Sequence, residues 1–462
     1  MAKGMQEARE GGGRAAAALM GTLIGALLAC GMSLASPRPQ AAVGGGDARA
    51  QEAQVPAPEG AAAAAAASSA STPAAAAASS TRRCVHTVLT SNGTPYMNWQ
   101  TRVMYASYKQ AAARSEGLMA AFTRVLHRVT PDELMTEVPT WRVDPLHVDC
   151  DEYCPYPVAD RAAAVALWLH EAESATCEYL MLVETDYLYA RPLREADLPA
   201  PGRGRAFSFG YVQPTNGGLR DIMEKLMPAA KFGPPSGVPR SGNAPSILSS
   251  KDFAATMPVW AEMNARIEAD GKMASRLGWV RDMYGFSIAS KRAGVTLDVD
   301  ESLMLQPPNS LKRSDAPIFH YTWGAIISDR NGNEVWRWDK REYTAGQYAP
   351  GPRKLERMPA PPAWDASKGY KLQDGKVVKE EQLGLIAQLI ELFNQAVATL
   401  PAVPDGFDGD LEAARRAALP GRHAKDEAAR RMTVVNRERD AKRPEAPDVV
   451  SQRLVEKMDQ LL

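Results

Sequence analysis

Residues 178–189 read EYLMLVETDYLY, an apolar run that ends abruptly in two carboxylates. The run itself, residues 179–183, has the length and composition of a strand buried inside a sheet. Glu184 and Asp186 follow it directly, with one residue between them. Because alternate residues of an extended chain point to the same side, the sequence predicts a buried strand that presents two acidic side chains at its carboxyl end.

Two earlier segments predict neighbouring strands, and helical patterns separate them. Residues 85–90 (VHTVLT) alternate as a short strand does, and residues 122–127 (FTRVLH) predict a second strand. Residues 98–113 place apolar side chains four positions apart, and a further helix is predicted to start near Asp160. Strands that alternate with helices predict an α/β protein with a mixed, mostly parallel sheet flanked by helices. Ligands of such sheets bind at the carboxyl ends of strands, where the two carboxylates lie.

The second half of the domain shows a less regular pattern. Gly and Pro are frequent up to GPPSGVPRSGNAPS (233–246), which we expect to be irregular. Regular structure is expected to return at residues 259–269, a helix is predicted at residues 279–290, and a strand at residues 303–308 (LMLQPP). Residues 381–400 predict an amphipathic helix that closes the domain.

The charge balance of the chain argues against one class of function. Its 462 residues contain 54 Lys and Arg and 54 Asp and Glu, so no net field attracts nucleic acid. The hydrophobic fraction of 45% and the charged fraction of 23% are typical of a globular protein. The length suits one large catalytic domain, or two smaller ones, with appendages. We therefore expect no nucleic-acid partner.

An apolar stretch near the N-terminus predicts membrane attachment. Residues 15–36 (AAAALMGTLIGALLACGMSLAS) contain no charge and no proline, over about the 20 residues needed to cross a bilayer core. Lys3, Arg9 and Arg14 precede this stretch, which favours a transmembrane signal anchor behind a cytoplasmic tail of residues 1–14. A cleaved signal peptide is the alternative. In both cases the rest of the chain enters the secretory pathway.

Composition divides the remaining chain into three parts. Residues 37–82 are rich in Ala, Pro and Ser and have few large apolar groups, so they predict a disordered stem. Residues 83–402 form the predicted catalytic domain, and residues 403–462 a charged C-terminal extension. A tail, a span, a stem and a globular body are the layout of a single-pass type II Golgi membrane protein with a lumenal domain.

Cysteine usage suits a lumenal domain. An oxidising lumen permits disulfides, and the sequence leaves their pairing open. Four cysteines follow the apolar stretch: Cys84, Cys150, Cys154 and Cys177.

The acidic pair suits the chemistry of sugar transfer from a nucleotide diphosphate sugar. Negative charge builds up on the diphosphate leaving group, and a divalent cation that bridges both phosphates stabilises it. Mn²⁺ and Mg²⁺ prefer oxygen ligands, which Glu184 and Asp186 supply. His320, in HYTWG, is a candidate third ligand through a neutral imidazole. A buried structural histidine is the alternative interpretation of His320.

A further carboxylate, Asp282, lies in the predicted helix beside Trp279 and Tyr284. A carboxylate next to that much apolar surface is costly to bury without a partner or a purpose. In one interpretation Asp282 is catalytic, because it positions the acceptor or stabilises an oxocarbenium-like centre. In the other it forms a salt bridge with Arg281 or Lys291.

Several long sequence blocks between residues 86 and 401 match a known family in the same order along the chain, which is more specific than any single motif. The strongest are NWQTRVMYASYK, FTRVLH, PTWRVDPL, VETDYLYARPL, GNAPSILS, GWVRDMYGFSIAS, LMLQPP, FHYTWG and EVWRWDKR. In these blocks the chain resembles the plant-type hydroxyproline O-arabinosyltransferases and the related peptidyl-serine galactosyltransferases. The resemblance implies a GT-A-like nucleotide-sugar-binding fold in a type II Golgi enzyme. It also implies transfer from UDP-β-L-arabinofuranose to hydroxyproline of secreted or cell-wall proteins, with retention and with a divalent metal, Mn²⁺ being favoured.

The resemblance assigns roles residue by residue. Glu184 and Asp186 match the acidic motif of the family. This chain has Glu184-Thr185-Asp186-Tyr187 where the arabinosyltransferases usually show Glu-Pro-Asp-His, so the proline and the histidine of the motif are replaced. Asp282 stands where that family typically has glutamate. Arg102 and Arg124 also lie in matched blocks. Each of them can either pair with diphosphate or form a buried structural ion pair. The remaining candidates are Asn243 for catalysis and Thr90, Arg102, Arg124 and Trp323 for donor binding.

The expected complex has the UDP-sugar at the carboxyl edge of the sheet. An extended, proline-rich acceptor peptide would cross the irregular segment around residues 236–245. Two other functions stay open: transfer of galactose to peptidyl serine, and a catalytically silent Golgi lectin or scaffold. Asn92-Gly93-Thr94 is an N-glycosylation sequon, and we expect it to be used less often than not because a glycan there would obstruct the donor site.

Overall fold

The computed structural model describes residues 82–128, 131–145, 156–170, 176–343 and 352–403. All of them belong to one compact unit of the chain. Within these residues no helix is both long enough and apolar enough to cross a membrane. The tail, the span at residues 15–36 and nearly all of the stem and of the C-terminal extension lie outside the described residues.

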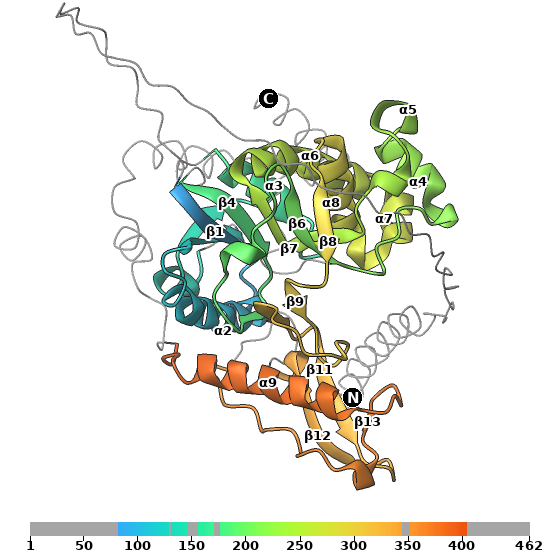
Figure 1. The fold of residues 1–462 in the computed structure, drawn as a ribbon. Helices are drawn as coiled ribbons and strands as arrows, with labels where there is room; N and C mark the ends of the chain where they lie inside the picture. Colours follow the sequence, from blue (N-terminus) through green and yellow to red (C-terminus); the bar gives the residue numbers. More distant parts are fainter. Residues whose placement is uncertain (1–81, 129–130, 146–155, 171–175, 344–351, 404–462) are drawn as a thin grey trace, which may run out of the picture. The chain divides into compact units, whose positions relative to one another are not determined.

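A seven-stranded sheet with the order β3-β2-β1-β4-β7-β6-β8 forms the centre of the unit (Figure 1). Every strand runs parallel to its neighbours except β7, which is antiparallel to β4 and β6. The prediction of a mixed, mostly parallel sheet is therefore confirmed. The strands are β1 (Arg82–Ser91), β2 (Met119–His127), β3 (Thr140–Val143), β4 (Cys177–Val183), β6 (Gly204–Ser208), β7 (Ser241–Ser249) and β8 (Leu297–Asp300).

Helices cover both faces of this sheet (Figure 1). On one face α6 packs between α3 and α8 and all three contact the strands, whereas α2 packs on the other. The helices predicted near Asp160 and at residues 98–113, 279–290 and 381–400 are confirmed. The helices are α2 (Pro95–Ala112), α3 (Arg161–Trp168), α4 (Arg220–Leu226), α5 (Ala229–Phe232), α6 (Ser250–Ala269), α7 (Gly271–Leu277), α8 (Arg281–Arg292) and α9 (Glu380–Val397).

Two small sheets extend the domain beyond the main one. The sheet β5-β10-β9 is formed by β5 (Tyr187–Tyr189), β10 (Ile318–His320) and β9 (Met304–Leu305). The sheet β12-β11-β13 is formed by β12 (Glu334–Asp339), β11 (Gly324–Ser328) and β13 (Lys371–Leu372). A second apolar core joins them to α2 and α9.

The rings of four residues form the centre of this second core. Trp99 stacks on Tyr321, and Trp338 and Phe393 pack around that pair. Because Trp99 belongs to α2 and Tyr321 follows His320 directly, the cluster holds the end of β10 against the helix that covers the main sheet.

One expectation about the fold was wrong. Residues 233–246 were expected to be irregular throughout, yet β7 begins at Ser241 and lies between two other strands of the main sheet. Ile247 and Leu248 are fully buried and give β7 its apolar contacts. Pro245 lies where the pairing of β7 with β6 is irregular, a place in a sheet that tolerates the missing N–H of proline. The glycine and proline content therefore concealed a central strand.

A disulfide links two neighbouring strands of the main sheet. Cys84 of β1 is bonded to Cys177 of β4, 93 positions later in the sequence. The pairing that the sequence left open is thus established for these two cysteines, whereas Cys150 and Cys154 lie outside the described residues. The bond restrains the strand that carries the acidic pair.

Removing this bond in the double variant Cys84→Ala, Cys177→Ala should lower the free energy of unfolding by about 2–5 kcal/mol, because the unfolded chain would lose a long covalent loop. Urea denaturation of both proteins without reductant measures the difference. Dithiothreitol should lower the urea concentration at the wild-type midpoint and reduce the difference in stability between the wild type and the double variant. A variant as stable as the wild type would contradict the assignment.

Candidate functional site

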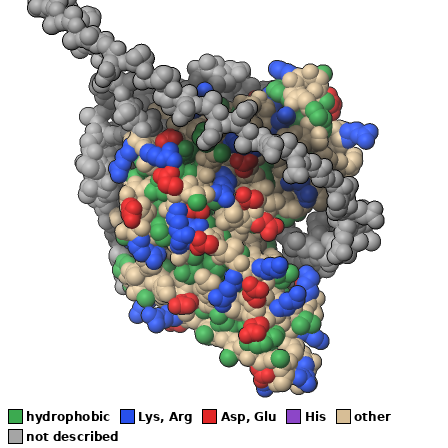
Figure 2. Space-filling view, viewed as in Figure 1, with side chains coloured by type: hydrophobic (Ala, Val, Ile, Leu, Met, Phe, Trp, Pro, Cys, Tyr) green, Lys and Arg blue, Asp and Glu red, His purple; other side chains and the backbone are tan. Residues whose placement is uncertain are grey.

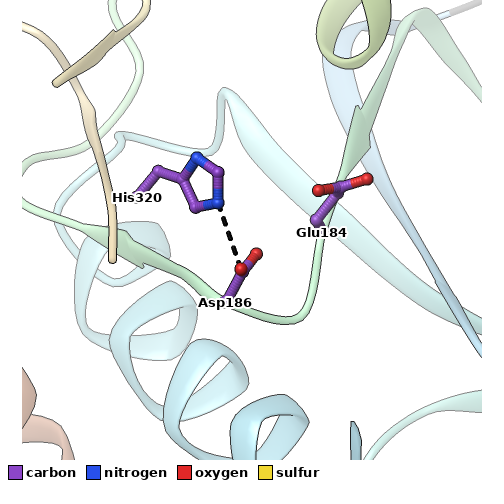
Figure 3. A group of neighbouring side chains, drawn as sticks. All are labelled: Glu184, Asp186 and His320. Atoms are coloured by element: carbon purple, nitrogen blue, oxygen red, sulfur yellow. Dashed lines mark hydrogen bonds and ion pairs between the residues drawn. The ribbon is translucent and has the colours of Figure 1, made fainter. Parts of the chain in front are cut away.

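The three candidate metal ligands meet at the carboxyl end of β4. One ligand atom from each of Glu184, Asp186 and His320 lies within 4.8 Å of the other two. Figure 3 shows Glu184 and Asp186 on the turn that leaves the strand, with the His320 ring facing Asp186. The structure therefore brings together residues that are 134 positions apart in the sequence.

Strand pairing carries His320 to this position. The chain enters β5 immediately after Asp186, and β10 pairs with β5 in antiparallel register, with His320 opposite Tyr187. His320 Nε2 lies 3.0 Å from Asp186 Oδ2. On its other side, His320 Nδ1 lies 3.1 Å from Gln306 Oε1 and 3.3 Å from Thr322 Oγ1. Contacts on both nitrogens hold the ring in one orientation, as partners of metal-binding histidines usually do.

Lys340 is a fourth member of the site that sequence reasoning missed. Its Nζ lies 2.5 Å from Asp186 Oδ2, and both side chains are only 10% exposed. Burial by itself would raise the pKa of Asp186, but the charges of His320 and Lys340 outweigh it and hold that pKa well below its usual range. Burial likewise opposes the charge on Lys340, yet Asp186 raises the pKa of the ammonium. The block EVWRWDKR contained Lys340, but a lysine between Asp339 and Arg341 gives no sign of being buried.

Arg161 connects the acidic pair to Asp282. Arg161 begins α3, and its Nη1 lies 2.6 Å from Glu184 Oε1 and 3.2 Å from Asp282 Oδ2. Tyr156 donates its hydroxyl to Asp282 Oδ1 at 3.1 Å. Burial raises the pKa of Asp282, and the Arg161 charge opposes that rise. Sequence reasoning placed the helix start correctly but did not single out Arg161, because nothing in α3 shows that it faces a carboxylate.

The two salt-bridge partners that the sequence suggested for Asp282 are wrong. Arg281 pairs instead with Glu268, at 2.6 Å, and its guanidinium lies over the Tyr156 ring. Lys291 lies against Gly237. Asp282 lies in the first turn of α8 and is buried, whereas the Arg281 side chain is partly buried against Tyr156 and Glu268. The helix periodicity did not reveal which distant cation would face the buried side.

Asn243 and Thr90 both lie at the same edge of the main sheet as Glu184. In β7 Ser246 is opposite Leu182, so the residues that precede Ser246 continue past the carboxyl end of β4. Thr90 is one position beyond Leu89, which is opposite Val183. Both side chains are buried.

Close packing brings α8 to the same edge. Gly242 lies so near Met283 of α8 that a Cβ on the glycine would come within 2.4 Å of Met283 Cε. Asn243 and Asp282 are the sequence neighbours of these two residues, so both catalytic candidates adjoin this contact.

The two arginine candidates form buried ion pairs. Arg102 contacts Glu137 at 2.8 Å and donates to the Pro401 carbonyl at 2.6 Å. Arg124 contacts both carboxylate oxygens of Asp132, at 2.5 and 2.9 Å. Of the two interpretations that the sequence left open, the geometry matches the structural ion pair for each.

Trp323 lies at the site but is partly exposed. Its ring is 5.5 Å from Lys340 Nζ and 4.9 Å from the Arg341 guanidinium carbon. The Trp323 carbonyl accepts a hydrogen bond from the backbone N–H of Lys340. Trp323 therefore stays a candidate for donor binding, and its ring lies next to the buried ammonium of Lys340.

The sequon asparagine is buried. The Asn92 side-chain oxygen accepts from the backbone N–H and the hydroxyl of Thr94, and Thr94 in turn caps α2. A glycan would be attached at Asn92 Nδ2, and this atom is buried, so glycosylation of the folded domain would require the turn to open.

The donor set fits a divalent cation. Two carboxylates and one imidazole are ligands that Mn²⁺ accepts, and each comes from a different position around one small volume. The Tyr187 hydroxyl lies beside them, fully buried and without a hydrogen-bond partner among the described residues. A buried hydroxyl in that condition is costly, which is consistent with a ligand-binding volume next to it.

Basic side chains form no stripe on the face seen in Figure 2. There Lys and Arg alternate with Asp and Glu over the described part of the chain. A nucleic-acid backbone is usually bound by clustered positive charge, so this face offers no such site.

Comparisons with known proteins identify relatives. A model of the hydroxyproline O-arabinosyltransferase family N-terminal domain matches residues 85–299. Hydroxyproline O-arabinosyltransferase 3 of Arabidopsis thaliana is 32% identical over 321 residues, which cover 68% of this chain and 81% of that protein. Hydroxyproline O-arabinosyltransferase 1 of the same plant is 30% identical over 327 residues, or 69% and 81%.

Two more distant matches are to proteins named for galactose transfer. Peptidyl serine alpha-galactosyltransferase of Arabidopsis thaliana is 23% identical over 282 residues, which cover 56% of this chain and 31% of that protein. The solved structure of the galactosyltransferase LgtC aligns with 51% of this chain and 87% of its own at 12% identity and a TM-score of 0.32, too low to define the fold. On the strength of the first two relatives, this chain belongs to the hydroxyproline O-arabinosyltransferase family.

Proposed function

We propose that this protein is a metal-dependent glycosyltransferase that moves L-arabinofuranose from a UDP-sugar to hydroxyproline in secreted polypeptides. The observation that carries the proposal is the meeting of Glu184, Asp186 and His320 at the carboxyl end of β4, in a chain that aligns with 81% of a hydroxyproline O-arabinosyltransferase. The edge of the sheet where they meet is where α/β proteins bind their ligands. On the same grounds we propose that the domain has a GT-A-like nucleotide-sugar-binding fold.

Glu184, Asp186 and His320 are the residues that would hold the metal, Mn²⁺ being favoured. A divalent cation there would stabilise the negative charge that develops on the departing diphosphate. Gln306 keeps the His320 ring in place through Nδ1, so that Nε2 faces the site. Arg161 holds Glu184 at 2.6 Å and limits its movement.

The acceptor side of the site is proposed to include Asp282 and Asn243. Asp282 is a buried carboxylate that Arg161 connects to Glu184, and Tyr156 fixes its other oxygen. Beside them, Trp279 is 53% exposed, and exposed aromatic rings are the usual partners of extended, proline-rich peptides. The peptide would continue toward a cavity of about 470 Å³ that Ser236 and its neighbours line.

We also propose that the protein acts in the Golgi lumen as a single-pass membrane protein. The apolar run at residues 15–36 and the Ala/Pro/Ser-rich stem support this location. The disulfide between Cys84 and Cys177 is of the kind that an oxidising compartment permits.

Transfer of galactose to peptidyl serine is the second candidate. It is favoured by the similarity to the peptidyl serine alpha-galactosyltransferase. The residues Thr185 and Tyr187, which depart from the usual arabinosyltransferase motif, lie directly at the metal-binding turn. Donor identity is therefore the property to measure first.

A donor screen separates the two candidates. The full-length protein should release UDP fastest from UDP-β-L-arabinofuranose and should require Mn²⁺. With that donor, a hydroxyproline peptide should gain a pentose, seen by mass spectrometry, whereas the matched serine peptide should not. Preference for UDP-galactose and serine would establish the second candidate, and failure with every donor would favour a silent lectin or scaffold.

Asp186→Asn and Glu184→Gln should each lower kcat by about 10²–10³-fold, because each removes a charge that holds the cation. The control is Glu178→Gln, which neutralises an exposed carboxylate of β4 that pairs with Arg83; its activity should stay within about twofold of wild type. Initial rates at saturating donor give the comparison, and melting temperatures establish that each variant is folded. Full activity of Asp186→Asn would contradict the proposed role.

Arg161→Lys should act on Asp282 rather than on the fold alone. A shorter, single-point cation cannot hold Glu184 and Asp282 together, so the Asp282 carboxylate loses stabilisation and its pKa rises. The acidic limb of the pH–rate profile should therefore move to higher pH, with kcat reduced more than KM changes. Arg276→Lys, at an exposed pair with Asp221, should leave the profile unchanged. An unshifted profile in Arg161→Lys would exclude this positioning role.

A further inference from the structure

Lys340 is buried at the centre of the site although nothing in the proposed chemistry of the metal requires it. It begins the short 3-10 helix Lys340–Tyr343 directly after β12. Its Nζ lies 5.5–6.0 Å from the ring centres of Tyr96, Tyr321 and Trp323. Aromatic faces attract a cation, so these rings keep the ammonium stable inside the protein.

The contact with Lys340 is made by the same Asp186 oxygen that faces the His320 ring. Asp186 Oδ2 contacts both His320 Nε2, at 3.0 Å, and Lys340 Nζ, at 2.5 Å. Glu184 likewise has a cation of its own, Arg161. Each acidic ligand is thus neutralised by a side chain of the protein before any metal arrives.

A divalent cation bound by Asp186 could not tolerate the ammonium at its present position. Two positive charges a few ångströms apart repel strongly where water is largely excluded. The lysine would have to leave Oδ2, and a buried ammonium that loses its carboxylate needs another anion. The diphosphate of the nucleotide is the anion that the proposed reaction brings to the same place.

We propose that Lys340 occupies the cation position at Asp186 in the absence of substrate and moves to the diphosphate when metal and nucleotide bind. The inference rests on the proposed function, since it assumes a nucleotide diphosphate and a metal at this site. A lysine suits such movement because its charge is compact and its four-carbon stem is flexible. The consequence is that metal and nucleotide strengthen one another's binding, by the same factor in each direction.

The test measures binding without turnover, on the full-length protein with Mn²⁺ and UDP. Free Mn²⁺ is followed by electron paramagnetic resonance, and UDP by calorimetry. In the wild type, UDP should tighten Mn²⁺ binding by at least about tenfold, and Mn²⁺ should tighten UDP binding equally. In Lys340→Met, Mn²⁺ alone should bind about tenfold more tightly than in the wild type, and the coupling should fall about tenfold, leaving only the part that direct contact between metal and diphosphate supplies.

Arg341→Met is the matched control. It removes one positive charge from the adjacent residue, over the same Trp323 ring, but this arginine pairs with Asp339 and is exposed. Its Mn²⁺ affinity and its coupling should equal those of the wild type. If Arg341→Met reproduced the effect of Lys340→Met, general charge rather than position would be responsible and the inference would be wrong.

Two further results would overturn the inference, and they differ in what else they overturn. Mn²⁺ that binds the wild type equally well with and without UDP would exclude the movement of Lys340 to the diphosphate, whereas the Mn²⁺ requirement of transfer is decided separately by the donor screen. This measurement needs no variant, so it decides the matter even if Lys340→Met does not fold. Mn²⁺ that binds under neither condition would overturn the metal dependence in the proposed function as well.

Discussion

The site depends on one carboxylate oxygen, Asp186 Oδ2, at which three distant parts of the chain meet. Asp186 follows β4, His320 ends β10 and Lys340 follows β12. The antiparallel pairing of β5 with β10 fixes the position of His320 along the strand, because Tyr187 and His320 are opposite each other. Strand pairing and the turn after β4 therefore bring the imidazole and the ammonium to the same oxygen.

Charge balance inside the site follows from burial. Asp186 and Asp282 are buried and Glu184 is partly buried, and unpaired charges in such surroundings would be unfavourable. Arg161 serves two of them, and Lys340 serves the third. The same pairing holds Glu184, Asp186 and Asp282 in place around the carboxyl end of β4.

The surrounding fold holds this arrangement through buried contacts away from the chemistry. The disulfide between Cys84 and Cys177 restrains β1 against β4. Arg102 and Arg124, which resemblance placed among the donor-binding candidates, pair with Glu137 and Asp132. Those contacts connect α2 and β2 to the segment before β3, so they hold this part of the domain together.

The amino-acid sequence by itself determined the strands at residues 85–90, 122–127 and 179–183 and most of the helices, because apolar periodicity and run length are local properties. It also determined the acidic pair after β4, since a carboxylate that interrupts an apolar run is visible without a structure. It did not reveal β7, because the glycines and prolines before Ile247 conceal a strand that only its neighbours β4 and β6 complete.

Tertiary structure alone decided which charges meet. Arg161 and Lys340 look like ordinary basic residues at the start of a helix and in a charged turn, and Arg281 looks like the natural partner of Asp282. The partners of a buried charge are set by strand pairing and by packing between segments more than a hundred positions apart. Sequence spacing carries no information about those contacts, and the free energy that fixes them arises only when water is removed from the assembled site.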